Sequence, residues 1–172
     1  MRLTVLIQGC LLLLSIFHAE AVDMGRLKIA STAFGHNERI PVKYTCDGAD
    51  ASPPLSIEGV PETAKSLALI MDDPDAPRGT WVHWLVWNIH PKIKEIAEGK
   101  VPSGAGLGMN DFRRLDYGGP CPPSGTHRYF FKLYALDTVL GLKQGATKAE
   151  LEKAMHGHVI AQAELIGLYS RK

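Results

Sequence analysis

Apolar residues occur in short runs separated by turn residues, and the two strongest runs lie mid-chain at residues 66–71 and 81–89. Both runs are too short, and too rich in Val, Ile and Trp, to be helices, so the pattern predicts two buried strands that pair with each other. The turn between them, residues 73–77, contains two prolines, whose fixed φ angles prevent either strand from continuing. The sequence therefore predicts a hairpin whose stiff turn presents Asp73 and Asp75.

The other apolar runs predict further short strands. Period-two patterns bounded by Gly, Pro and Asn predict strands at residues 27–31, 40–44, 55–57, 127–136 and 161–169. The first two of these look like a hairpin, and the pattern of the last also fits a helix. Many short strands with tight turns are typical of a mainly β fold. We expect a central antiparallel sheet, a second smaller sheet and few peripheral helices.

One helix is predicted near the end of the chain. Thr147, with Glu150 three residues later, forms a capping box, which predicts a helix from residue 147 to residue 156 that Gly157 ends. Residues 92–100 are predicted to be a surface loop with at most one helical turn. The glycine-rich residues 104–125 are predicted to be a loop that borders a pocket.

Strand alternation places one histidine in apolar surroundings. Within residues 81–89 one strand face is predicted to carry Trp81, His83, Leu85 and Trp87. A buried imidazole needs a hydrogen-bond partner, and the nearest polar groups in sequence are the carboxylates of Asp73 and Asp75. Such a pair is either the minimal unit of an anion-binding or acid–base site, or a hydrogen bond that only fixes the turn. The spacing does not decide between these interpretations.

The strand at residues 127–136 adds a second histidine. His127 and Tyr129 share one strand face, whereas Arg128 points to the other and is expected to pair with a carboxylate outside the pocket. Together with Asp73, Asp75 and His83, His127 completes four polar candidates for one site. No pair of them has the HxH or HExxH spacing typical of metal ligands, so no metal is expected.

Composition limits the range of functions. The 172 residues, 45% of them hydrophobic, are enough for one domain with a sizeable core. Nineteen basic and 18 acidic side chains leave a net charge of +1, which argues against a nucleic-acid partner.

The first residues are typical of a secretory signal peptide. Met1 and Arg2 precede an apolar run at residues 3–17, and Ala19 and Ala21 provide the small residues of a cleavage site. We expect a signal peptide at residues 1–21, a mature domain at residues 22–172 and no transmembrane segment after cleavage. Cys10 precedes most of the apolar run, so lipidation is not expected.

Two cysteines remain in the mature chain, Cys46 and Cys121, and both are predicted to lie in loops. Export into an oxidising compartment favours a disulfide between them, although two buried thiols would also fit the sequence. The rival chemical interpretation is a hydrolase that uses Cys121 or the His83/His127 pair.

Several motifs resemble those of the phosphatidylethanolamine-binding protein (PEBP) family, most closely its bacterial Raf-kinase-inhibitor-like branch. The two signature regions are DPDAP at residues 73–77, followed by the strand with His83, and GPCPP at residues 119–123, leading into THRY at residues 126–129. Further matches are YTCDG at 44–48, SPPL at 52–55, NDF at 110–112 and GATKAEL at 145–151. The resemblance covers nearly all of the mature chain.

This resemblance implies a binding module rather than an enzyme, without a cofactor. Its small cavity would take a phosphate-like anion or a phospholipid headgroup, and the residues implied to line it are Asp73, Asp75, His83, Pro123, His127 and Tyr129. The resemblance also implies a role in modulating or inhibiting a protein partner such as a kinase, here in the bacterial periplasm. The oligomeric state, including a homodimer, stays open.

Overall fold

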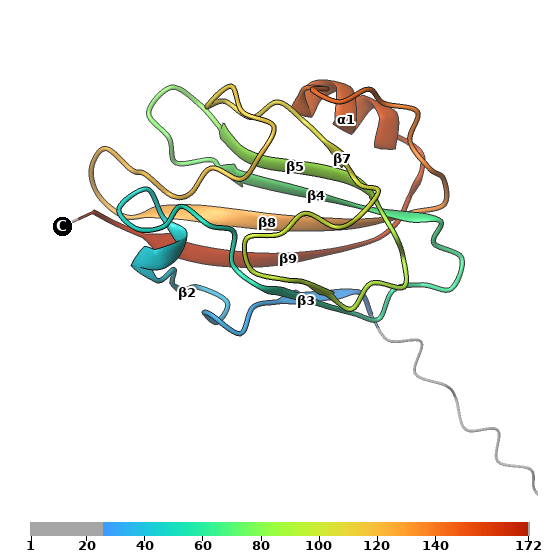
Figure 1. The fold of residues 1–172 in the computed structure, drawn as a ribbon, viewed down its shortest axis with the longest axis horizontal. Helices are drawn as coiled ribbons and strands as arrows, with labels where there is room; N and C mark the ends of the chain where they lie inside the picture. The colour runs from blue at the N-terminus through green and yellow to red at the C-terminus, as the bar shows by residue number, and fades with distance from the viewer. Residues whose placement is uncertain (1–25, 172) are drawn as a thin grey trace, which may run out of the picture.

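A six-stranded sheet forms the centre of the computed structural model, which describes residues 26–171 (Figure 1). The strand order is β2-β9-β8-β4-β5-β7. Its strands are β2 (Glu38–Arg39), β4 (Ser66–Asp73), β5 (Trp81–Ile89), β7 (Gly106–Leu107), β8 (His127–Leu136) and β9 (Val159–Tyr169). All pairs are antiparallel except β2 with β9. No helix within the described range is long and apolar enough to cross a membrane.

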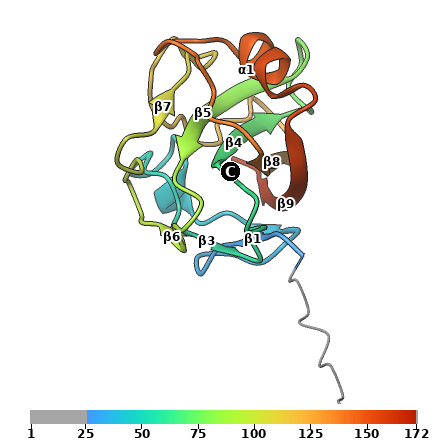
Figure 2. The same ribbon diagram turned by 90° about the vertical axis from the view of Figure 1, so that its right-hand side faces the viewer.

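A smaller sheet and one helix cover the two faces of the large sheet (Figure 2). The small sheet has the order β1-β3-β6, with β1 (Lys28–Ala30), β3 (Leu55–Glu58) and β6 (Glu95–Ile96). The helix α1 (Lys148–Met155) lies on the opposite side. The predicted mainly β fold with two sheets and few helices is therefore confirmed. The predicted signal peptide, its cleavage site and Cys10 lie outside the described residues.

Two apolar layers hold these elements together. The layer between the sheets includes Leu55, Ile57, Leu69, Met71, Trp84 and Phe131, and the layer under α1 includes Ala68, Ile70, Leu85, Trp87, Leu151 and Met155. Alternate residues of β4 enter the two layers, so all eight residues of this strand are buried. A central strand that is buried on both faces must be apolar throughout, which explains the continuous run that the sequence presents there.

The capping box at the start of α1 is formed as predicted. The Thr147 hydroxyl accepts from the Glu150 amide, and the Glu150 carboxylate accepts from the Thr147 amide at 2.7 Å. The helix is also tied to the large sheet through Asp72, which is fully buried on β4. Lys132 Nζ on β8 lies 2.8 Å from its carboxylate, and Lys148 Nζ on α1 lies 2.6 Å away. Two lysines from different elements thus converge on one buried charge.

The predicted hairpin at the N-terminal end is wrong. Instead, β1 pairs with β3, and β2 pairs in parallel with β9 near the other end of the chain. Within residues 40–44, Val42–Tyr44 form a 3₁₀ turn in which the Tyr44 amide donates to the Pro41 carbonyl. Pro41 has no amide hydrogen for a strand ladder, which explains why no strand forms there. The expected loop at 92–100 also contributes a strand, β6, to the small sheet.

A β-bulge at His83 alters the predicted faces of β5. Met71 pairs with Trp84 and Asp72 with Val82, so His83 is an extra residue that faces no residue of β4. As a result, Leu85 and Trp87 pack towards α1, whereas Trp84 and Val86 pack towards the small sheet. The prediction that Leu85 and Trp87 share a face with His83 is therefore wrong, because regular alternation does not continue through a bulge.

Candidate functional site

A cavity of about 260 Å³ lies where β4, β5 and β8 meet the glycine-rich loop. It is lined by Asp73, Ala76, Pro77, Trp81, His83, Phe112, Cys121, Pro122, Pro123 and His127. Most of these side chains are apolar, and no lysine or arginine lines the cavity among the residues that the structure describes. The titratable groups in its lining are two imidazoles and one carboxylate.

His127 and Asp73 form the first polar pair of the cavity. His127 Nδ1 lies 2.7 Å from Asp73 Oδ2, and both side chains are buried, at 8% and 5% exposed. The other carboxylate oxygen of Asp73 accepts from the Asp75 amide at 2.8 Å, which holds the turn after β4 in place. Because the carboxylate occupies Nδ1, the Nε2 atom of His127 remains for a ligand in the cavity.

His83 is held by the loop rather than by a carboxylate. Its Nδ1 atom donates to the Gly118 carbonyl at 2.6 Å, and the Gly118 amide donates back to the His83 carbonyl at 3.0 Å. Asn110 Nδ2 also donates to that carbonyl. The bulge leaves the His83 backbone free for these bonds, and burial lowers the pKa of the imidazole. The prediction that Asp73 or Asp75 is the partner of His83 is wrong.

Gly118 must be a glycine for this contact to form. A Cβ atom there would meet the Phe112 ring at 2.4 Å, which is closer than two carbon atoms can approach. The Phe112 ring in turn lies edge-on to His83 and to Trp81, with centroids 5.3 and 5.4 Å apart. The loop therefore supplies both a hydrogen-bond acceptor and an aromatic wall.

A disulfide fixes the far wall of the cavity. Cys121 is bonded to Cys46, with Cα atoms 5.4 Å apart, and both cysteines are exposed to solvent. The Cys46 amide also donates to the Pro120 carbonyl, and Tyr117 donates its hydroxyl proton to the Tyr44 carbonyl. The loop that carries Cys121, Pro122 and Pro123 is thus attached to the segment after the 3₁₀ turn.

The structure brings four of the six predicted site residues to the cavity: Asp73, His83, Pro123 and His127. Asp75 points elsewhere, because Arg128 binds both of its oxygens, with Nε at 2.9 Å and Nη2 at 2.7 Å. This pairing lowers the pKa of the Asp75 carboxyl to about 2, and it gives Arg128 the carboxylate partner that the strand pattern predicts.

Tyr129 lies beneath the cavity rather than in its wall. It is fully buried, with its ring edge-on to His83 at 5.2 Å and stacked with His127 at 6.5 Å. Burial raises the pKa of its phenol well above the usual range. Tyr129 therefore supports both imidazoles from the core side.

Sequence reasoning missed Phe112, although it lies in the NDF motif, because nothing in one loop sequence shows which strand the loop approaches.

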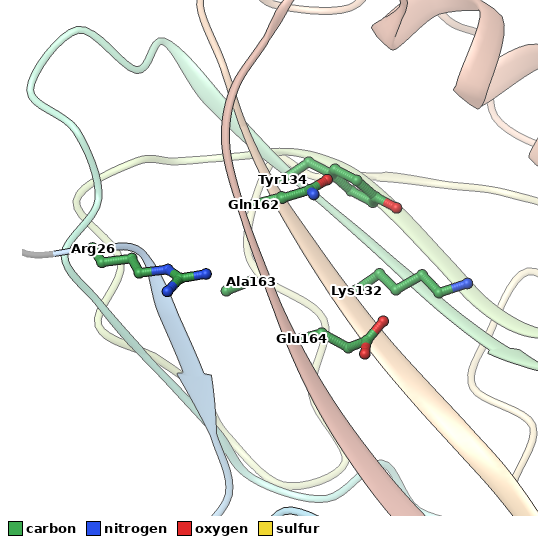
Figure 3. Close-up of a pocket in the computed structure, with 6 residues that line it drawn as sticks. All are labelled: Arg26, Lys132, Tyr134, Gln162, Ala163 and Glu164. Atoms are coloured by element: carbon green, nitrogen blue, oxygen red, sulfur yellow. The ribbon is translucent and has the colours of Figure 1, made fainter.

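A larger hollow of about 360 Å³ lies along β8 and β9 (Figure 3). Lys132 and Glu164 project into it side by side from these paired strands, and Arg26, Tyr134, Gln162 and Ala163 complete its lining. The Lys132 ammonium is already bonded to Asp72. The hollow contains charges of both signs, and its Lys132 ammonium is not available to a ligand. It is therefore a weaker candidate site than the cavity with two imidazoles.

The protein-family model described as phosphatidylethanolamine-binding protein matches residues 30–170, which is most of the chain. The chain belongs to the phosphatidylethanolamine-binding protein family. A UPF0098 protein of Pyrococcus abyssi is 56% identical over 151 residues, which are 83% of this chain and 84% of the relative.

Two solved structures have the same fold as this PEBP-family chain. A putative PEBP homologue from Chlamydia trachomatis superposes with a TM-score of 0.83 at 45% identity, covering 86% of this chain and 99% of that one. YbcL of Escherichia coli, described as a member of the mammalian PEBP family, has a TM-score of 0.81 at 32% identity, covering 86% and 100%.

We expect His83 to make the stability of this PEBP-family chain decrease as the pH falls below about 6.5. Burial lowers the pKa of His83 in the native state, so in this range the unfolded chain binds more protons than the native protein. The free energy of unfolding therefore rises with pH between the native pKa and the unfolded value. Urea unfolding at several pH values in this range should show that the free energy of unfolding rises less with pH in His83→Gln than in the wild type. An equal rise with pH in both proteins would contradict a neutral, buried His83.

Proposed function

We propose that this protein is a binding module that takes a phosphate-type oxyanion in the cavity of Asp73, His83 and His127. One observation supports the proposal above all. Two imidazoles line the same apolar cavity, and in each the Nδ1 atom is occupied by a protein acceptor, Asp73 or Gly118. The Nε2 atoms are therefore the groups left for a ligand, and a phosphate-type group offers several oxygens to them.

His127 is the residue that would supply the positive charge. When its ring is protonated, Nε2–H donates to an anion oxygen, and the Asp73 carboxylate at Nδ1 balances the charge of the imidazolium. The aromatic rings of Trp81 and Phe112 and the prolines of the far wall would contact the rest of the ligand. Pro122 and Pro123 have no amide hydrogen, so this part of the loop contributes shape rather than donors.

The test is calorimetric titration of inorganic phosphate at about pH 6, near the second pKa of phosphate monoesters. We expect His127→Gln to weaken phosphate binding roughly tenfold or more, because it removes a charged donor from a buried site. His158→Gln is the matched control, since His158 pairs with Asp137 at 2.8 Å but both side chains are about half exposed, far from the cavity lining. Unchanged affinity in His127→Gln would show that phosphate binds elsewhere.

The hydrolase alternative finds little support. Cys121 is bonded to Cys46 and so has no thiolate with which to attack a substrate. The two imidazoles are held at Nδ1 by Asp73 and Gly118, and their remaining nitrogens are suited to holding a ligand without any covalent step. A binding role therefore accounts for the site with fewer assumptions.

We also propose that the protein is exported, to the periplasm if its source is bacterial, and that it modulates a protein partner there. The pattern of residues 1–21 supports export, and so does an exposed disulfide, which is typical of proteins in an oxidising compartment. The role towards a partner rests on the family resemblance alone and stays a prediction.

A further inference from the structure

We propose that the cavity selects oxyanions that keep one proton, and that His83 is the residue that makes this selection. The ligand class is the monoanion of a phosphate monoester or of phosphate itself, in preference to sulfate or a phosphate diester. This inference rests on the proposed anion site and adds a rule for which anions it accepts. The rule follows from the direction in which the proton of His83 points.

The hydrogen bond to Gly118 fixes the tautomer of His83. A backbone carbonyl only accepts hydrogen bonds, so the 2.6 Å contact requires the proton to lie on Nδ1. The loop holds this carbonyl firmly, since the Gly118 amide is bonded to the His83 carbonyl and the adjacent Gly119 amide to Asp50. In the neutral ring Nε2 therefore carries a lone pair and no proton. His83 offers the cavity an acceptor.

The surroundings of His83 favour this neutral ring. The ring is 2% exposed, and burial lowers its pKa. The charged and titratable groups that act on it are Asp72 and Asp73 on β4, His127 and Tyr129 on β8, and Asp111 in the loop. Asp72 is paired with Lys132 and Lys148. The carboxylates act in the opposite direction to burial, but Asp73 is bonded to His127 and Asp111 to the Val82 amide. None of these carboxylates makes a hydrogen bond to the His83 ring.

The charge balance of the cavity points to the same ligand. Asp73 is already present, no described lysine or arginine lines the wall, and a protonated His127 would be the single cation in contact with the ligand. A dianion would add two negative charges to an apolar space with that one cation, which is unfavourable because buried charge must be compensated. A monoanion brings one uncompensated negative charge fewer into this space than a dianion does.

A protonated phosphate group matches both imidazoles at once. Its P–OH donates to His83 Nε2, while a charged oxygen accepts from His127 Nε2–H. Sulfate has the same tetrahedral shape but carries no proton near neutral pH, so its oxygen would face the lone pair of His83 without a hydrogen bond. A phosphate diester, the form in which phosphate occurs in a phospholipid headgroup, has the same defect. The cavity should therefore favour monoesters over intact phospholipid.

The experiment compares anions by calorimetry with the full mature chain at about pH 6, near the second pKa of a phosphate monoester. We expect inorganic phosphate and methyl phosphate to bind at least roughly tenfold more tightly than sulfate and dimethyl phosphate, because only the first two can donate to His83. Affinity for methyl phosphate should fall roughly tenfold or more between about pH 6 and pH 8 as its monoanion disappears. O-phosphoethanolamine separates an organic monoester from free phosphate.

Two further measurements isolate His83. The variant His83→Gln can present an amide N–H₂ donor in place of Nε2, so its preference for phosphate over sulfate should shrink towards a ratio of about one. His158→Gln should keep the wild-type ratio. Long-range ¹⁵N–¹H NMR of the unsubstituted protein reads the tautomer without any substitution, and we expect the proton of His83 on Nδ1.

The outcomes distinguish the two proposals. If none of the anions binds, the anion site itself is wrong. If phosphate and sulfate bind equally well, the site stands but the selection by His83 is wrong. A proton on Nε2 of His83, or a preference for phosphate that survives in His83→Gln, would also overturn the selection rule. A strong preference for the diester would overturn the rule as well and would indicate that the cavity binds an intact phospholipid headgroup.

Discussion

Replacement of Cys46 and Cys121 by serine is expected to lower the free energy of unfolding by about 4 kcal/mol. The two cysteines are 75 residues apart, so their disulfide removes a large amount of conformational entropy from the unfolded chain. Hydrogen bonds from Cys46 to Pro120 and from Tyr117 to Tyr44 still connect the same segments, so we expect the variant to fold. Denaturant unfolding under non-reducing conditions measures the difference.

Reduction of the wild-type protein provides the matched comparison. Both cysteines are exposed, so a thiol reductant should lower the stability of the wild type to that of the double serine variant and leave the variant unaffected. Anion affinity should weaken in both cases, because Cys121 and the prolines that follow it form one wall of the cavity. Equal stability of the variant and the oxidised wild type would contradict the expected contribution of the disulfide.

Removal of both lysines that contact Asp72 is expected to cost about 3–5 kcal/mol of stability, the cost typical of leaving a buried charge without a partner. Asp72 is fully buried beneath α1, and the ammonium groups of Lys132 and Lys148 are its charged partners, at 2.8 and 2.6 Å. The double variant Lys132→Met, Lys148→Met keeps the alkyl volume but leaves the carboxylate uncompensated. Thermal and urea unfolding measure the loss.

Two further variants test whether the loss of stability comes from the unpaired charge of Asp72. Adding Asp72→Val to the double variant should recover most of the lost stability, because the site then becomes apolar like its neighbours Ile70 and Val82. Lys153→Met, on the exposed side of the same helix, should leave the free energy of unfolding nearly unchanged. If the triple variant were no more stable than the double variant, lost packing rather than charge would explain the effect.

Local patterns predicted the elements whose signals lie within a few residues. Thr147 and Glu150 identify the helix start, because a capping box is a contact between residues three positions apart. The runs at 66–71 and 81–89 identify the central hairpin, because strands buried on both faces must be apolar throughout. The strand at 27–31 formed as β1, but its predicted hairpin with residues 40–44 did not, since strand partners far away in the chain leave no local trace.

Prediction of the site was limited in the same way, because contacts between distant residues leave no local pattern. Strand alternation predicted that His127 and Tyr129 share a face, because β8 has no irregularity in that region. It failed around His83, because an extra residue in β5 is visible only when the partner strand is known. The hydrogen bond from His83 to Gly118 spans 35 residues and depends on that bulge, so no local pattern distinguishes Gly118 from Asp73 or Asp75 as the partner of His83.

The parallel pair of β2 and β9 has a consequence for how the protein is made. Glu38 pairs with Gly167 and Arg39 with Leu168, so one of the first strands completes its hydrogen bonds with one of the last residues of the chain. During synthesis the large sheet cannot be completed until β9 has left the ribosome, because β2 has no other partner strand within residues 26–171. Contacts between such distant segments also slow folding. The large sheet is therefore completed only after β9 has been synthesised.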